Sequence, residues 1–211
     1  MRKRGRRIAG AAGAATLAAA WLGPLPELAA GSFAAHMAMH VSVVAVAAPL
    51  LALGVAGGRL DPARRWPGAV APIPLALAEL AVVWGWHAPA LHHAARQGGG
   101  PLALEQGSFL LCGVLVWVSA FGGEPARRAE RASLGIVALL MTAMHVTLLG
   151  ALLALAPRPL YAHGPGGPLG LSALDDQHLG GALMLAVGGS VYLAGALALA
   201  AGLVAARREA A

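Results

Sequence analysis

The chain has 211 residues, of which 58% are hydrophobic and only 11% are charged. Soluble domains are typically about 45–50% apolar and about 25% charged, so this composition excludes an ordinary soluble fold and predicts an integral membrane protein surrounded by lipid. Much of the apolar content is Ala and Gly, which membrane helices place where they pack closely. No long polar stretch divides the chain, so we expect residues 1–211 to form a single domain.

The apolar runs predict an all-α bundle of about six transmembrane helices. In chain order they cover roughly residues 8–22, 33–53, 70–86, 104–121, 134–156 and 178–206, each near the length that a bilayer of about 30 Å requires. The first run is long for the core of a signal peptide and short for a span. We interpret it as a retained helix, because the turn Gly23-Pro-Leu-Pro26 follows it and no convincing cleavage site precedes that turn; a signal segment is the alternative.

Basic residues predict the orientation of this bundle. Five lie before Ile8, three within 59–65, three within 127–131 and two at 207–208, so thirteen of the fifteen fall on one side of the predicted spans. The positive-inside rule assigns that side to the cytoplasm, which puts both termini there and the protein in the cell membrane. The net charge of +6 is then explained by topology, and we expect no nucleic-acid partner.

The histidines segregate to the opposite side, at or near the predicted outer face. Seven of the eight are there: His36, His40, His87, His92, His93, His163 and His178. His36 and His40 are four residues apart and share one helix face, and neutral imidazoles at that spacing suit a transition metal. Met37 and Met39 add thioethers that favour Cu(I). The alternative is that both histidines only form hydrogen bonds between helices, and His87 on the next helix is a candidate third ligand.

Other polar residues in or near the spans have simpler interpretations. Glu79 lies mid-span and is expected to be protonated and hydrogen-bonded, with a proton or ion path as the alternative. Met141, Met144 and His145 share a helix face. This pattern indicates either packing against another helix or a second Cu(I)-binding position in the middle of the membrane. We expect His92, His93 and His163 to be solvated in loops, and Asp175 and Asp176 to cap the helix predicted to open at His178. Cys112 is the only cysteine, so a metal site must use His, Met or carboxylate ligands.

Five motifs in this order resemble the polytopic CtaG family of cytochrome c oxidase assembly factors. They are Ser32-Phe-Ala-Ala-His-Met-Ala-Met-His40 with Ala48-Pro-Leu-Leu-Ala-Leu-Gly54, then Trp86-His-Ala-Pro-Ala-Leu91, Ala156-Pro-Arg-Pro-Leu-Tyr161, and Leu174-Asp-Asp-Gln-His-Leu-Gly-Gly181 with Gly188-Gly189. The resemblance runs from about Leu22 to Tyr192. It implies a non-enzymatic membrane factor that matures a haem–copper oxidase and handles copper on the outer half of the membrane, contacting an oxidase subunit during assembly.

The resemblance also adds a candidate ligand, and this chain differs from the family's usual pattern at two places. His36, His40, His87 and Asp176 stand at positions that match the family's motifs, and with Met37 they form our predicted copper site. The family commonly has Glu-His where this chain has Glu105-Gln106, which removes one candidate ligand from the fourth span. It also tends to have Trp where Leu185 stands.

Two other function classes fit the same residues. Two helices that each offer a histidine at similar depth could ligate haem axially, as in a membrane electron carrier. A small ion or metal transporter could use Glu79 and His145 to line a path. No nucleophile–base pair or Gly-rich phosphate motif appears, so we do not predict an enzyme.

Overall fold

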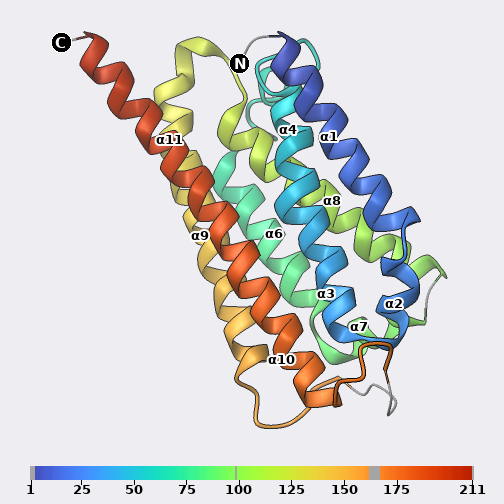
Figure 1. The fold of residues 1–211 in the computed structure, drawn as a ribbon. Coiled ribbons are helices and arrows are strands. Elements are labelled where there is room, and N and C mark those ends of the chain that lie inside the picture. Colours follow the sequence, from blue (N-terminus) through green and yellow to red (C-terminus); the bar gives the residue numbers. More distant parts are fainter. Residues whose placement is uncertain (1–2, 98, 162–166, 211) are drawn as a thin grey trace.

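The protein is a helical bundle, seen in a computed structural model that describes residues 3–97, 99–161 and 167–210 (Figure 1). Every regular element within those ranges is a helix, which confirms the predicted all-α class. The elements, in chain order, are α1 (Lys3–Leu22), α2 (Leu25–Gly31), α3 (Phe33–Val41), η1 (Ser42–Ala47), α4 (Ala48–Val55), α5 (Pro62–Arg65), α6 (Pro72–Trp86), α7 (Pro89–Arg96), α8 (Gly99–Phe121), η2 (Pro125–Arg127), α9 (Arg128–Ala154), α10 (Ala173–Leu183), η3 (Met184–Gly188) and α11 (Gly189–Ala210).

In the described part of the chain, six helical rods lie where the six spans were predicted. Four of them are long and apolar enough to cross a membrane, namely Phe33–Val55, Gly99–Phe121, Pro125–Ala154 and Ala173–Ala210. The first rod, α1 with α2, meets the same test only as a pair bent by 46°. The α6 rod is apolar but only 15 residues long. The predicted count of six is therefore approximate, with four to five spans supported by length and composition.

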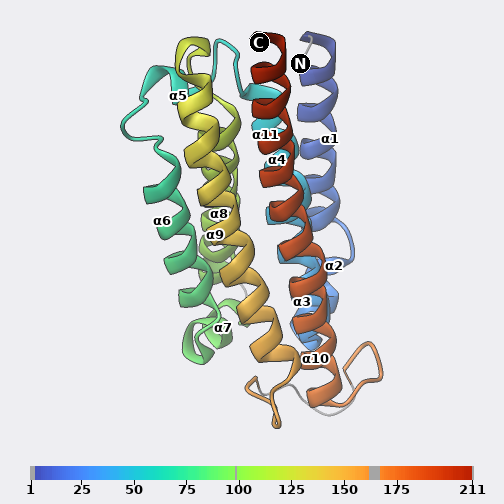
Figure 2. The same cartoon turned by 90° about the vertical axis from the view of Figure 1, so that its left-hand side faces the viewer.

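The two ends of the bundle differ in charge. Both views place the start of α1 and the end of α11 at one end, and α2, α7 and α10 at the other (Figure 1 and Figure 2). The basic residues that flank α1, α5, α9 and α11 therefore lie at the first end, which we call the basic end. The histidines of α3 and α7 lie toward the second, which we call the histidine end.

Small residues bring α1 close to α4. A Cβ atom added at Gly13 would lie 2.9 Å from the backbone nitrogen of Leu51, and one added at Gly54 would lie 2.9 Å from the Cα atom of Gly10. Side chains at these positions would push the helices apart. Helix α1 is thus packed closely against α4 in the bundle.

The last rod begins earlier than the sequence predicted. Helix α10 starts at Ala173, and its N-cap is Ser172, whose hydroxyl accepts from the backbone N–H of Asp175. The Asp175 carboxylate accepts in turn from the Ser172 hydroxyl at 2.6 Å. Our prediction that the aspartates cap a helix opening at His178 was therefore wrong, because this serine supplies the cap one turn before them.

Candidate metal centre

Helix α3 carries the two central histidines on its buried face. His36 and His40 are one turn apart and only 1% and 5% exposed. The start of α3 is fixed by its N-cap Ser32, whose hydroxyl accepts from the Ala35 N–H, and by the carboxylate of Asp176 from α10. That carboxylate accepts from the Phe33 N–H at 2.6 Å and from the Ser32 hydroxyl at 2.7 Å. The first turn of α3 is thus held in place by a neighbouring helix, which fixes the depth of both imidazoles.

Glu105 of α8 completes a cluster with these histidines. Its Oε1 atom lies 3.3 Å from Nε2 of His36 and 3.5 Å from Nε2 of His40, and the carboxylate is fully buried. One ligand atom from each residue lies within 4.8 Å of the others. The two imidazole rings are themselves perpendicular, with centroids 4.2 Å apart. Two nitrogens and a carboxylate oxygen that converge in this way can bind a transition-metal ion.

The amide of Gln106 sets the orientation of His40. Gln106 Nε2 lies 2.9 Å from His40 Nδ1 and donates to Glu105 Oε2 at 3.3 Å, while its Oε1 accepts from the Trp21 indole at 3.1 Å. An amide N–H that faces Nδ1 favours the imidazole tautomer with its proton on Nε2, on the side of Glu105. If His40 Nε2 held a metal, its ring proton would have to lie on Nδ1, and Gln106 could accept that proton only through its amide oxygen.

His87 stands next to this cluster with one nitrogen prepared for a ligand. It ends α6, and its Nδ1–H donates to the Val83 carbonyl oxygen at 2.7 Å. Nε2 is then the acceptor nitrogen, and it is buried without a hydrogen-bond partner among the described residues. The His87 ring centroid is 6.1 Å from that of His40. This pattern is typical of metal-binding histidines, in which a carbonyl fixes the tautomer and the other nitrogen faces the ion.

His92 is part of the same group, and our prediction that it is solvated in a loop was wrong. Helix α7 packs back onto the bundle, so His92 is only 2% exposed and its ring centroid is 4.9 Å from that of His36. On its other side lies Tyr161, at 4.3 Å between centroids. Burial, followed by the nearby histidines, lowers the pKa of His92 well below its usual value, so the imidazole is neutral. Its Nε2 has no hydrogen-bond partner within the described ranges.

A cavity of about 200 Å³ lies on the far side of His92. It is lined by Pro89, His92, His93, Arg96, Leu160 and Tyr161. His93 is exposed, as expected, whereas His92, at the preceding position of α7, is buried. His92 therefore adjoins both the cavity and the cluster, and His93 adjoins only the cavity.

Two other predicted ligands have different surroundings. The Asp176 carboxylate accepts from three groups at the start of α3, the third being the Ala34 N–H at 3.1 Å. It is not in the three-residue cluster of His36, His40 and Glu105 found among the described residues. Met37 is buried and packs with Phe33 in an apolar core. It also lines a small internal cavity beside His40 and His87.

That internal cavity connects the histidines with Glu79. It has a volume of about 30 Å³, and the two π-helical segments η1 and η3 adjoin it through Val44 and Met184. The Glu79 carboxylate accepts from Tyr192 at 2.5 Å and from Thr142 at 3.0 Å. The hydrogen-bonded state that we expected for Glu79 is thus present.

The remaining candidates do not join the cluster. Met144 is 67% exposed on the outside of α9, whereas His145, one residue on, is 4% exposed and both of its ring nitrogens lack a partner in the described part of the chain. His178 is half-buried, with Nε2 2.9 Å from the Ala156 carbonyl oxygen. His163 lies outside the described residues.

Comparison with known families identifies the family of the chain. A model of the family described as cytochrome c oxidase caa3 assembly factor (Caa3_CtaG) matches residues 2–206. The chain belongs to this family. Family membership confirms the resemblance that the motifs indicated, makes the protein an assembly factor of cytochrome c oxidase, and implies interaction with the oxidase during assembly. No curated protein and no solved structure matches the chain.

Sequence reasoning underestimated two residues of the site. Glu105 was noted only as half of a changed family motif, yet it lies between both α3 histidines. A carboxylate in an apolar span is by itself a signal of function, and that rule would have selected it. His92 had no comparable signal, because its burial depends on how α7 folds back.

Proposed function

We propose that this assembly factor acts by binding copper at His36, His40 and Glu105 and passing it to a haem–copper oxidase. The observation that carries the proposal is the approach of one buried carboxylate oxygen to Nε2 of both histidines, at 3.3 and 3.5 Å. Burying these three groups is costly unless they are paired or bind an ion. Imidazole suits copper, and the carboxylate supplies the charge that balances a monovalent cation.

Neighbouring groups favour a site that both holds and releases its ion. Nε2 of His87 and of His92 is buried without a partner in the described ranges, and the His87 ring adjoins His40 while the His92 ring adjoins His36. The Met37 thioether lines the cavity next to His40 and His87 and favours the Cu(I) state. His92 also lines the cavity of about 200 Å³ described above, so we infer that copper enters or leaves the site through this cavity.

The orientation of the protein follows from its charges. We infer that the basic end faces the cytoplasm, with both termini there, and that the histidine end lies in the outer half of the cell membrane. A copper ion held there is at a depth from which it could be transferred to a buried oxidase site. The role requires no catalytic step by this chain.

The geometry does not favour the haem alternative. The internal cavity next to His40 and His87 has a volume of about 30 Å³. This volume accommodates about one water molecule. Ligands the size of a porphyrin occupy pockets of roughly 300 Å³ or more. A copper ion needs no such space.

Copper analysis of the purified protein tests the proposal. We expect protein from copper-supplied membranes to hold about one copper ion per chain, and the double variant His36→Gln and His40→Gln to hold almost none. The variant His178→Gln is the control, because His178 lies outside both the cluster and the cavity beside His92, with its Nε2 atom 2.9 Å from the Ala156 carbonyl oxygen. Equal copper in the double variant and the wild type would refute this site. A b-type Soret band in the visible spectrum would instead support haem.

A further inference from the structure

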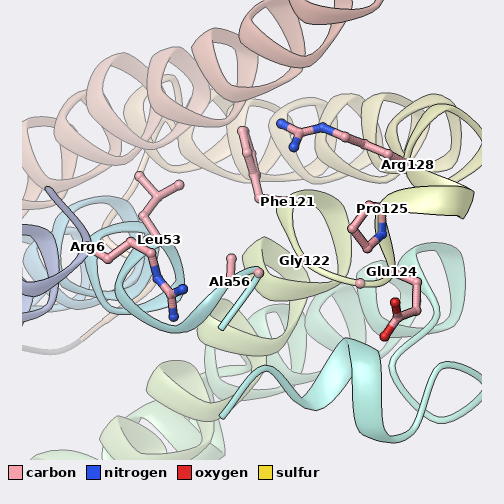
Figure 3. A pocket seen from close by; sticks show the side chains of 10 residues that line it. Arg6, Leu53, Ala56, Phe121, Gly122, Glu124, Pro125 and Arg128 are labelled. Atoms are coloured by element: carbon pink, nitrogen blue, oxygen red, sulfur yellow. The ribbon is translucent and has the colours of Figure 1, made fainter. Parts of the chain in front are cut away.

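A further cavity lies at the basic end, far along the bundle from the histidines. Its volume is about 460 Å³, and it opens between the start of α1, the end of α4, the end of α8 and the start of α9. The residues that line it are Arg6, Leu53, Ala56, Gly57, Phe121, Gly122, Gly123, Glu124, Pro125 and Arg128 (Figure 3). Neither the copper proposal nor family membership uses this cavity.

One buried carboxylate organises the loops beside the cavity. Asp61 is 1% exposed and accepts from the backbone N–H of Gly57 at 2.7 Å and of Gly123 at 2.8 Å. Both glycines have positive φ angles, +70° and +94°. Residues other than glycine rarely adopt this backbone conformation. Asp61 thereby joins the loop after α4 to the loop after α8. The two loops that border the cavity are therefore held in fixed positions by the fold.

The cavity carries net positive charge. Glu124 is its one acidic lining residue, and Glu124 forms an ion pair of 2.9 Å with Arg64. Arg6 donates to the carbonyl oxygens of Gly54 and Val55 at the end of α4, from Nε and one Nη atom. Its guanidinium has five N–H groups, so others remain for a ligand. Arg128 is exposed at the start of α9.

Between the two arginines the wall is apolar. Figure 3 shows Leu53 beside Arg6, and Phe121 between these two residues and Arg128. The cavity therefore offers two guanidinium groups and two large apolar side chains side by side at the same helix ends. This arrangement matches an amphiphile with an anionic head and apolar tails.

We propose that this cavity binds the headgroup of an anionic phospholipid of the adjoining leaflet. Its phosphate would lie between Arg6 and Arg128, because guanidinium groups bind phosphate oxygens in pairs of hydrogen bonds. Its acyl chains would follow Leu53 and Phe121 into the membrane. Basic pockets between helix ends are a recurring form of headgroup site.

Native mass spectrometry of the full chain in detergent tests the proposal. Phosphatidylglycerol and phosphatidylcholine are titrated separately, and we expect one phosphatidylglycerol to bind at least tenfold more tightly. The variants Arg128→Gln and Ala56→Glu should each reduce this preference about tenfold or more. Ala56→Glu keeps both arginines and places a carboxylate in the cavity, so it guards against effects of Arg128 on folding.

Arg127→Gln is the matched control, because it removes the same charge one residue away. Arg127 lies outside the cavity and pairs with Glu130 at 3.4 Å, so this variant should keep the preference. The proposal is overturned if all three variants behave alike, or if the wild type binds both lipids equally. It is also overturned if millimolar inorganic phosphate displaces the phosphatidylglycerol, since the cavity would then be a site for soluble phosphate.

Discussion

Replacing Glu105 by Gln separates a metal ligand from a structural hydrogen bond. The substitution keeps the size and planar shape of the side chain and removes its negative charge. Its Oε1 atom lies 3.3 and 3.5 Å from Nε2 of His36 and His40, so an ion bound to these nitrogens lies within about 4 Å of the carboxylate. At that separation two unit charges attract by about 4 kcal/mol at an effective dielectric constant of about 20.

Part of that attraction is offset by the cost of burying the carboxylate. We therefore expect Glu105→Gln to weaken Cu(I) binding about 100-fold, equivalent to about 2.8 kcal/mol at 1.4 kcal/mol per tenfold change. Without metal, the variant should unfold at a temperature equal to or above that of the wild type, because it no longer buries a charge. The assay combines competition with a chromophoric Cu(I) chelator and thermal unfolding of metal-free protein. A large fall in unfolding temperature with unchanged copper affinity would refute the reasoning and leave only a structural role.

Three further substitutions test neighbouring parts of the site. His40→Met should retain more copper than His40→Gln, because a thioether still binds Cu(I); the opposite order in chelator competition would indicate an interhelical hydrogen bond. Gln106→Glu should tighten Cu(I) binding about tenfold, because a carboxylate accepts from His40 Nδ1–H and leaves Nε2 free for the ion; weaker binding would show that the amide does not control the tautomer. Asp176→Asn should lower the free energy of unfolding by about 1–3 kcal/mol, since the start of α3 loses a charged acceptor, while copper per folded chain stays constant; loss of copper at unchanged stability would make Asp176 a ligand.

The sequence predicted those features that depend on local pattern. The apolar runs defined the six rods, and the four-residue spacing put His36 and His40 on one face. The position of His87 at the end of the next apolar run likewise made it a candidate third ligand. Each of these follows from neighbours in the chain or from a run long enough to cross a bilayer.

Features that depend on packing between distant segments were missed. His92 is buried only because α7 folds back against Tyr161 and α3. Asp176 was expected to cap its own helix, yet its carboxylate accepts from the first N–H groups of α3, more than 140 residues earlier. The end of α4 is similarly joined to the end of α8 by Asp61, which no local pattern indicated.

The copper content of the oxidase made in cells tests the central claim most directly. A strain without this protein would be complemented with the wild type, Glu105→Gln or the control His178→Gln, at matched membrane levels under copper limitation. The account predicts that the haem–copper oxidase from the Glu105→Gln strain lacks copper and activity, that both return with the control, and that a bd-type quinol oxidase, which contains no copper, is unaffected throughout. A fully copper-loaded, active oxidase in the Glu105→Gln strain would contradict it.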